Sequence, residues 1–444
     1  MLAKISQHFI RIPRLGIFLV FLLTVQHAFP QGTWDRIDVQ TTQNLHSVCF
    51  VDNLYGWVVG DSGTILHTTD GGNSWIQQDS PVENDIIYVF FLNRNLGWAS
   101  AYNFTIPPYG TILLKTTNGG AEWTSTLYHQ ENIFITCIHY FDSLTGWMGG
   151  KPHALVKTTD GGINWTQAAI DTSTLAFFPV LKLAFLNEEV GYACGGMFDI
   201  AGVIWRTHNG GDLWYAINPS QAPADEVHSL YIFDELNVMG CGGDPDYGYG
   251  VGMIRSTDSG INWNYDEIGV QGIAFDLDFR TPSQAWSPLG PLQKLIFSLD
   301  SGATWTEIPT LDNLAIFDIT FTDSLNGCAV GDAGAILKYK PSVQPGIPPF
   351  PNFTDKGITC KMFPNPTKGN LKLEIRNLRS GFVSIHLYSL LGDKVARMVN
   401  EELAPGIHSF SFDTEKENLS PGVYLYQLQV DGVVRDQGKL IVIH

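Results

Sequence analysis

The sequence predicts an all-β protein, a seven-bladed β-propeller followed by a small C-terminal β-sandwich. Three observations predict this fold. An eight-residue phrase of the form TTDGGNSW recurs six times between residues 68 and 305. Aromatic residues make up 12% of the chain and glycine is abundant, as expected of many short strands joined by tight turns. The last part of the chain alternates apolar and polar residues between turns, which is the period of half-buried strands.

The first thirty residues differ from all that follows. Lys4, Arg11 and Arg14 precede the apolar run LGIFLVFLLTV at 15–25. A helix rises 1.5 Å per residue, so this run is too short to cross ~30 Å of hydrocarbon. A basic start before a short apolar run is typical of a secretory signal peptide. We expect residues 1–30 to act as one, with cleavage near Ala28–Gln31.

Each copy of the phrase lies within a unit of four strand-like segments. In the first unit these are HSVCFV (46–51), GWVVG (56–60), TILHT (64–68) and a segment that begins at Trp75. The units repeat every 42–49 residues or so, and four short strands in such a period are the signature of a propeller blade.

The chemistry of the phrase is that of a turn. Asp or Asn at its third position can accept hydrogen bonds from turn N–H groups. Glycine two residues later tolerates positive φ, and the final Trp is a large rigid anchor between blades. We therefore interpret the phrase as scaffold. The turn-capping residues are Asp70, Asn118, Asp160, Asn209, Asp258 and Asp300, and the anchors are Trp75, Trp123, Trp165, Trp214, Trp263 and Trp305.

Six copies of the phrase predict seven blades. The last unit, residues 317–340, offers three strands and then stops. The stretch GTWDRIDVQ (32–40) has the form of a missing fourth strand, with Trp34 in the place of Trp75. Docking it beside residues 335–340 closes the seventh blade and removes exposed sheet edges. We expect the propeller to span residues 31–340.

The phrase resembles the Asp-box, or bacterial neuraminidase repeat, S/T-x-D-x-G-x-T/S-W. In that family the box joins the outer two strands of each blade, on the face opposite the binding site. With the upstream GW of each unit, the pattern is similar to the photosystem II stability/assembly factor-like branch of these propellers. That branch also occurs in organisms without photosynthesis, so the resemblance implies a fold more than a function.

A proline-rich linker is expected at 341–356, and residues 357–444 contain five further strand-like segments. This region resembles the type A C-terminal sorting domain of the type IX secretion system along its whole length. The resemblance implies a Bacteroidetes-type export route, with the protein secreted or attached to the outer cell surface and the secretion machinery as a partner. The motif residues that carry the resemblance include Pro364, Asn365, Pro366, Gly422 and Tyr424.

Charge and cysteine spacing exclude several classes of partner. The formal net charge is −18, and residues 31–340 alone carry −22, which disfavours nucleic acid and anionic lipid. No further membrane segment is present. The cysteines show neither CxxC nor metal-ligand spacing, so we expect buried free thiols and no metal or other cofactor. They are Cys49, Cys137, Cys194, Cys241, Cys328 and Cys360.

An enzyme is the less favoured interpretation. Sialidases need three arginines to hold a carboxylate, and the one sialidase-like string, FIRIPR (9–14), lies in the expected signal peptide. A polysaccharide-acting glycoside hydrolase remains the alternative, with Asp276 and Asp278 on one side of an innermost strand and Asp318 in the next blade. The same residues could instead form an ion network along the channel.

Function is expected in the loops on the face opposite the phrase. Three loops between second and third strands are expanded, at 101–110, 195–202 and 241–250, and length variation on one face of a repeat is where binding evolves. Their aromatic and acidic side chains would suit a glycan or a protein partner, although the loops could also fold on themselves. The candidates are Tyr102, Phe104, Tyr109, Phe198, Asp199, Asp244, Asp246, Tyr247 and Tyr249. The sequence thus favours a secreted binding module.

Overall fold

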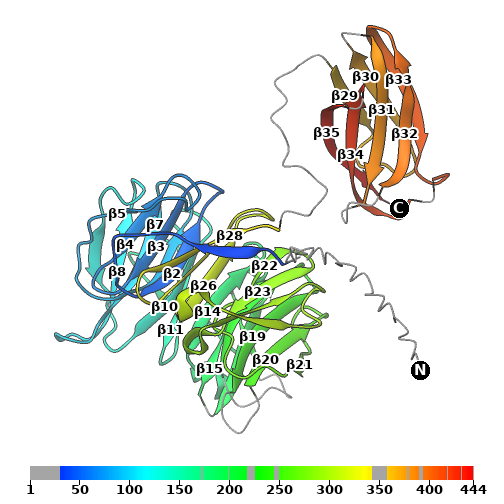
Figure 1. Ribbon diagram of the computed structural model, residues 1–444. Coiled ribbons are helices and arrows are strands. Elements are labelled where there is room, and N and C mark those ends of the chain that lie inside the picture. The colour runs from blue at the N-terminus through cyan, green and yellow to red at the C-terminus, as the bar shows by residue number, and fades with distance from the viewer. Residues whose placement is uncertain are drawn as a thin grey trace, which may run out of the picture. The chain divides into compact units, whose positions relative to one another are not determined.

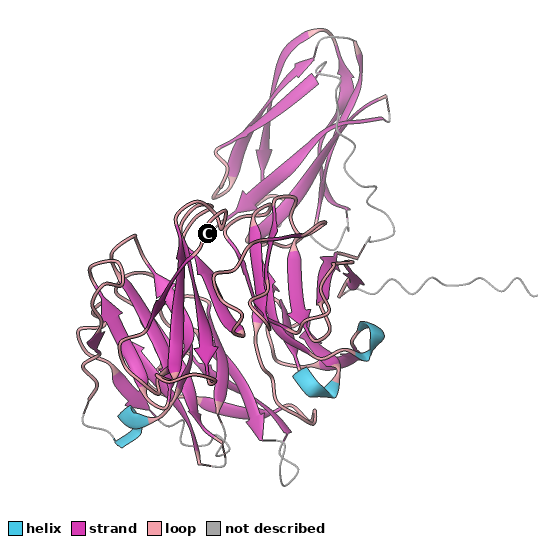
Figure 2. Cartoon of the chain, turned by 90° about the vertical axis from the view of Figure 1, so that its left-hand side faces the viewer, coloured by secondary structure: helices cyan, strands magenta, loops and turns pink. Residues whose placement is uncertain are grey.

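The computed structural model describes residues 31–171, 174–198, 200–217, 226–244, 250–342, 358–377, 380–389, 394–417, 419–431 and 433–443. The expected signal peptide and most of the expected linker lie outside these residues. The chain divides into two compact units, one ending at Ser342 and one beginning at Val343. In the described parts nearly all regular structure is strand (Figure 2). Three short 3-10 helices are η1 (Thr174–Phe177), η2 (Gly290–Leu292) and η3 (Leu311–Asn313).

The first unit contains seven four-stranded antiparallel sheets in a propeller-like arrangement (Figure 1). We number these sheets as blades 1–7 in the chain order of their innermost strands. Blade 1 has β2 (Leu45–Phe50), β3 (Gly56–Gly60), β4 (Ile65–Thr68) and β5 (Ile76–Gln77). Blade 2 has β6 (Ile86–Phe91), β7 (Gly97–Asn103), β8 (Gly110–Thr116) and β9 (Thr124–Leu127). Blade 3 has β10 (Phe134–Tyr140), β11 (Gly146–Lys151), β12 (Ala154–Thr158) and β13 (Thr166–Gln167).

The remaining blades repeat this plan. Blade 4 has β14 (Val180–Phe185), β15 (Gly191–Met197), β16 (Ala201–Thr207) and β17 (Tyr215–Ile217). Blade 5 has β18 (Val227–Ile232), β19 (Val238–Asp244), β20 (Gly250–Ser256) and β21 (Asn264–Glu267). Blade 6 has β22 (Asp278–Thr281), β23 (Gln284–Pro288), β24 (Lys294–Ser298) and β25 (Thr306–Pro309). Blade 7 has β26 (Ile316–Phe321), β27 (Gly327–Gly331), β28 (Ala335–Lys340) and β1 (Thr33–Arg36).

Blade 7 takes its outermost strand from the other end of the unit. Strand β1 pairs antiparallel with β28, with Trp34 opposite Tyr339, so the predicted pairing of these segments is confirmed. The Trp34 side chain is 6% exposed and lies edge-on against the rings of Trp286 and Tyr339. The N-terminal strand therefore completes blade 7 and also fills the space between blades 6 and 7.

Apolar packing joins each blade to the next. Seven clusters of buried side chains each combine residues of two consecutive blades within the described residues. One of them joins Leu45 and Val58 of blade 1 to Val330 and Ile336 of blade 7. The first and last blades therefore pack as the other pairs do.

The innermost strands share a β-bulge. In blades 1–5 and 7 the pairing with the second strand shifts by one residue near the start of the innermost strand. Bulges re-aim the side chains beside them. Lys182 and Asp318 come directly after such shifts, and their side chains meet across blades, as described below.

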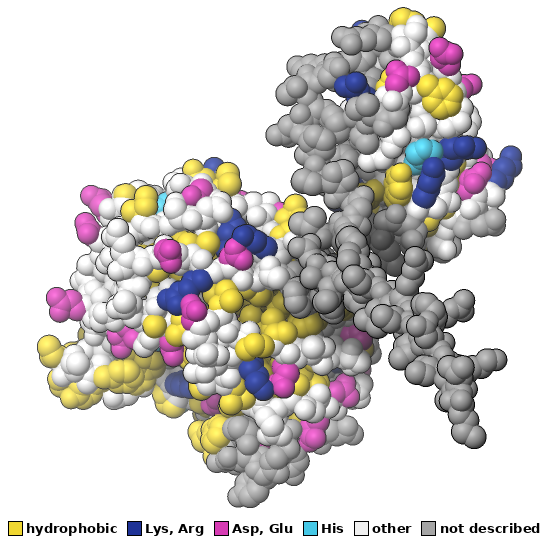
Figure 3. Space-filling view, in the orientation of Figure 1, with side chains coloured by type: hydrophobic (Ala, Val, Ile, Leu, Met, Phe, Trp, Pro, Cys, Tyr) yellow, Lys and Arg dark blue, Asp and Glu magenta, His cyan; other side chains and the backbone are white. Residues whose placement is uncertain are grey.

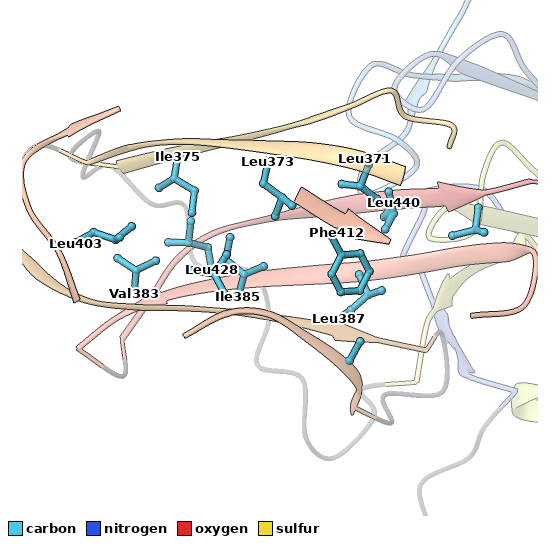
Figure 4. Close-up of a cluster of buried hydrophobic side chains, with 13 residues drawn as sticks. Leu371, Leu373, Ile375, Val383, Ile385, Leu387, Leu403, Phe412, Leu428 and Leu440 are labelled. Carbon is cyan, nitrogen blue, oxygen red and sulfur yellow. The ribbon is translucent and has the colours of Figure 1, made fainter. Parts of the chain in front are cut away.

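The second unit holds two antiparallel sheets. Three strands form one, β29 (Ile358–Phe363), β30 (Asn370–Asn377) and β33 (Gly406–Asp413). Four form the other, in the order β32 (Lys394–Leu403), β31 (Gly381–Tyr388), β34 (Gly422–Val430) and β35 (Val433–Val442). A buried core takes Leu373 and Phe412 from one sheet and Ile385 and Leu428 from the other (Figure 4). Two of the five expected segments each contain parts of two strands, which the alternation pattern alone did not separate.

The motif residues of this second unit act within its fold. Asn365 donates from Nδ2 to the carbonyl of Lys439 at 2.8 Å and accepts from the Ile441 N–H at 2.9 Å, which ties the Pro-Asn-Pro turn to β35. The Tyr424 hydroxyl donates to the carbonyl of Ser420 at 2.7 Å. In the part of the chain that the structure describes, no helix is long and apolar enough to cross a membrane.

All six cysteines are free thiols. Four are buried, and Cys49 and Cys360 are partly exposed. The prediction of buried thiols therefore holds for four cysteines, whereas Cys49 and Cys360 are less buried than predicted.

Candidate functional site

The six phrase turns are closed by their own side chains. In the first, the Thr68 hydroxyl donates to Asp70 Oδ1 at 2.8 Å and accepts from the Gly72 N–H at 2.9 Å. Asp70 also accepts from the N–H and the hydroxyl of Ser74, at 2.9 and 2.6 Å. In the sixth turn, hydrogen bonds from Thr304 and Ser298 lower the pKa of Asp300 to about 2. The Asp carboxylate and the Thr or Ser hydroxyl of these two turns thus form hydrogen bonds within the turn.

A cation on the third strand links each of several blades to the turn of the next blade. Lys115 donates to the carbonyl of Gly161 at 3.1 Å, and Lys157 to that of Gly210 at 2.8 Å. Arg206 and Arg255 make the equivalent bonds to the following turns. These repeat-position cations therefore hold neighbouring blades together.

The candidate hydrolase carboxylates belong to a buried ion cluster that spans several innermost strands. Lys182 of blade 4 contacts Asp276 of blade 6 at 2.9 Å and Asp318 of blade 7 at 3.4 Å. Ser229 of blade 5 donates to Asp276 at 2.6 Å. Asp318 also accepts from the Val48 N–H of blade 1 at 2.8 Å. The cluster thereby joins the innermost strands of blades 1, 4, 5 and 7 to the segment that leads into β22 of blade 6. The prediction that Asp276 and Asp278 lie on one innermost strand is wrong, because β22 begins only at Asp278.

Burial and charge act in opposite directions on this cluster. Burial alone would raise the pKa of Asp276, but the Lys182 ammonium lowers it. For Asp318, burial raises the pKa despite the same ammonium, and the charge of Asp276 adds to the rise. The two carboxyl groups also hydrogen-bond each other, so they share a proton more easily than they ionise together.

Asp278 lies apart from the cation. It accepts from the N–H groups of Phe321 and Phe279, at 2.6 and 2.7 Å, and burial raises its pKa to about 7. The structure brings Asp276 and Asp318 together around Lys182, whereas Asp278 links blades 6 and 7 through the backbone. Among the described residues no group of three or more His, Cys, Asp or Glu is placed to hold a metal ion.

The expanded loops are shorter than the sequence suggested, because the flanking strands extend into them. Tyr102 lies in β7, partly buried, with its ring against Phe104 and Phe134. Asp244 ends β19 and is 6% exposed. The expectation that these two residues are exposed loop residues was therefore wrong. Longer strand pairing satisfies backbone groups that a free loop would leave to water. Asp199, Asp246, Tyr247 and Tyr249 lie outside the described residues.

Exposed apolar side chains nevertheless gather on the expected face. They belong to the β7–β8 loop, the β15–β16 loop and the connection between blades 3 and 4, which all open on that face. On the side of the unit seen in Figure 3, hydrophobic side chains form groups, whereas Asp and Glu are scattered. We define the loop-face patch as Phe104, Ile106, Tyr109, Phe177, Phe198 and Ile200.

Two residues that the sequence analysis missed shape this patch. Phe134, at the start of blade 3, stacks on Phe104 with ring centroids 4.6 Å apart. Asn103 donates from Nδ2 to the carbonyls of Ile106 and Pro108, at 2.7 and 2.9 Å, and so holds the loop in its fold. Phe134 has no local signal, because its contact crosses from one blade to the next.

Family comparison gives two separate matches. Residues 27–130 and 109–230 match the family described as photosynthesis system II assembly factor YCF48. Residues 361–443 match the secretion system C-terminal sorting domain. The chain joins a YCF48-type propeller to a secretion-system sorting domain. The YCF48-type match ends within the first strand of blade 5, and the repeat continues beyond it in the structure.

Relatives of the YCF48-type propeller cover most of the first unit. The chain is similar to photosystem II stability/assembly factor HCF136 of Arabidopsis thaliana, at 24% identity over 69% of this chain and 79% of that protein. It is also similar to the photosystem II assembly lipoprotein Ycf48 of Nostoc sp., at 25% identity over 69% of this chain and 87% of that protein. A solved structure described as YCF48 bound to D1 peptide covers 69% of this chain and 96% of its own, at 22% identity and a TM-score of 0.55. A solved structure described as an ancestral GH74 enzyme covers 92% of this chain and 63% of its own, at 11% identity and a TM-score of 0.53. At these identities the structural likeness shows the fold alone.

Proposed function

We propose that this protein is an exported interaction module whose propeller binds polypeptide segments through its loop-face patch. In this proposal the seven sheets form one closed seven-bladed ring over residues 31–340, and the C-terminal sheets form a β-sandwich. The apolar clusters between consecutive blades and the core shared by the two C-terminal sheets support these architectures.

The exposed apolar patch is the observation that carries the binding proposal. Phe104 and Ile106 are 64% and 70% exposed, and Tyr109, Phe198 and Ile200 lie on the same face. Large apolar groups left exposed together mark interaction sites in soluble proteins. Ile106 and Ile200 favour a polypeptide over a glycan, because sugar rings stack on aromatic faces rather than on branched aliphatic side chains. The peptide bound by a YCF48 structure of similar fold supports the same class of ligand.

We expect the double change Phe104→Ser and Ile106→Ser to weaken peptide binding by about tenfold or more, since a few large anchors carry most of an interface's affinity. Binders are selected from a random 12-residue peptide library with the purified protein, and their Kd values are measured by calorimetry. Ile76→Ser is the matched control, because Ile76 is 72% exposed but lies on the outer strand of blade 1. Equal losses in both variants, or unchanged affinity in the double variant, would refute the loop face as the site.

Export is proposed to proceed in two steps. Residues 1–30 act as the signal peptide, residues 341–356 as a linker, and residues 357–444 as the sorting domain of a type IX route to the outer surface. The match of residues 361–443 to sorting domains supports this route. The mature propeller is then secreted or attached to the outer cell surface.

Deleting residues 357–444 should leave the propeller in the periplasm, at surface levels reduced about tenfold or more. Signal-peptide cleavage should continue, because it depends only on the N-terminus. Protease accessibility on intact cells, compared with cell fractions, measures the distribution. A variant that lacks residues 1–30 as well as residues 357–444 is the control for retention in the cytoplasm. Normal surface levels of the truncated protein would contradict the proposed route.

The hydrolase alternative is not favoured by the geometry of its candidate residues. Asp276 and Asp318 are buried and bonded to Lys182, Ser229 and backbone N–H groups. A hydrolytic pair must instead reach a glycosidic bond from two sides. We propose that this cluster holds the innermost strands together.

A further inference from the structure

A cavity of about 460 Å³ opens between blades 2 and 3. One wall comes from the outer strands of blade 2, with Leu113, Lys115 and Thr126. The opposite wall comes from blade 3, with Ile138 on the innermost strand and Trp165 at the phrase turn. We call this cavity the inter-blade slot. Its volume is within the range of small-molecule sites.

One side chain that crosses the preceding junction has no counterpart of the same length here. Between blades 1 and 2, Gln78 donates to the Gly119 carbonyl at 2.9 Å and accepts from Trp123 Nε1 at 3.3 Å. The packing there is so close that a Cβ on Gly120 would lie 2.0 Å from Gln78.

Strand register identifies the matching residue in blade 2. His67 pairs with Ile76 in blade 1, and Lys115 pairs with Thr124 in blade 2. Two residues further along each outer strand, Gln78 therefore corresponds to Thr126. The threonine side chain is two heavy atoms shorter and is exposed. It leaves the junction open where glutamine would cross it.

The slot also differs in charge from the rest of the propeller. Lys115 lines it and uses one of its three N–H donors on the Gly161 carbonyl. Neither Asp nor Glu is among its lining residues, although residues 31–340 carry a net charge of −22. An anionic group is therefore favoured here and disfavoured over most of the surface.

We propose that the inter-blade slot binds a small amphipathic carboxylate. Its carboxylate pairs with the Lys115 ammonium, and its apolar part lies between Ile138, Ile163 and Trp165. None of the residues that define the loop-face patch lines the slot, so this binding is distinct from the proposed peptide binding.

The test uses 4-phenylbutyrate as the probe, with 4-phenylbutylamine as the cationic counterpart of the same length. Calorimetry on the full-length mature protein should show the carboxylate binding at least tenfold more tightly than the amine. Lys115→Met should weaken carboxylate binding about tenfold or more, the loss expected when a hydrogen bond to a charged group is removed. No detectable binding of the carboxylate, or equal binding of the two probes, overturns the proposal.

Thr126→Gln is the most direct test, because it introduces into blade 2 the residue type that Gln78 provides at the junction between blades 1 and 2. It should abolish probe binding and leave the thermal midpoint unchanged, since Thr126 is exposed. Thr306→Gln, on the exposed outer strand of blade 6, is the matched control and should bind the probe normally. The Phe104→Ser and Ile106→Ser variant should also bind it normally. Unaltered probe binding in Thr126→Gln would overturn the assignment to the slot.

Discussion

Trp34→Ala is expected to lower the free energy of unfolding by about 3–5 kcal/mol, the usual cost of truncating a buried aromatic side chain. Trp34 is buried among Trp286, Phe321 and Tyr339, and it anchors the strand that completes blade 7. Its loss leaves a cavity between two blades and weakens the pairing of β1 with β28. Urea unfolding followed by tryptophan fluorescence and circular dichroism measures the effect.

Thr33→Ala in the same strand is the matched control. Thr33 is exposed, so its truncation should change stability by no more than about 0.5 kcal/mol. If both variants unfold at the wild-type urea concentration, β1 is not an integral part of the propeller in solution.

Lys182→Met is expected to cost about 3–5 kcal/mol at pH 8, because it leaves two buried carboxyl groups without their cation. Without the ammonium, burial raises the folded-state pKa values of Asp276 and Asp318 above those of the unfolded chain. Groups with a raised folded pKa contribute stability below the unfolded pKa and lose it as the pH rises. The stability difference between variant and wild type should therefore shrink as the pH falls from 8 to 4.

Comparing the variant with wild type isolates the contribution of Asp276 and Asp318 to the pH dependence of stability. Burial lowers the pKa of His139 and His228 to about 4, which costs stability in acid, but both histidines are present in the two proteins. Lys294→Met serves as a control, because Lys294 pairs with Glu307 at 2.8 Å on the exposed outer strands of blade 6. This surface pair should contribute about 0–1 kcal/mol. A constant difference between Lys182→Met and wild type across the pH range would contradict the role given to the cluster.

The sequence predicted those features whose chemistry is local. The phrase turns could be predicted because Asp70 and its partners lie within seven residues of one another, and the repeat period then located the strands. The pairing of β1 with β28 followed from a count of strands per unit. Three residues of the loop-face patch, Phe104, Tyr109 and Phe198, were among the predicted candidates, whereas the strand positions of Tyr102 and Asp244 were not predicted. How far a strand pair extends into a loop depends on packing that alternation does not show.

The features that the sequence did not predict depend on contacts between blades. Lys182 meets Asp276 and Asp318 across 94 and 136 positions of the chain. At the inter-blade slot, Thr126 of blade 2 occupies the position that Gln78 has in blade 1. This difference can be recognised only when the exact register of the two outer strands is known. Strand boundaries inferred from a repeat are not accurate to one residue, so the two positions could not be matched beforehand.

The pairing of β1 with β28 also sets the order in which this protein can mature. The Tyr339 hydroxyl donates to the carbonyl of Gln31 across 308 positions of the chain, so the two ends meet only after every intervening blade has been synthesised. Contacts of such long sequence separation make folding slow. We expect the ring of sheets in a nascent chain to remain open until then, because β1 has no partner strand before β28 has been made. Once the ends have joined, neither terminus of the propeller offers a loose strand from which unfolding can start.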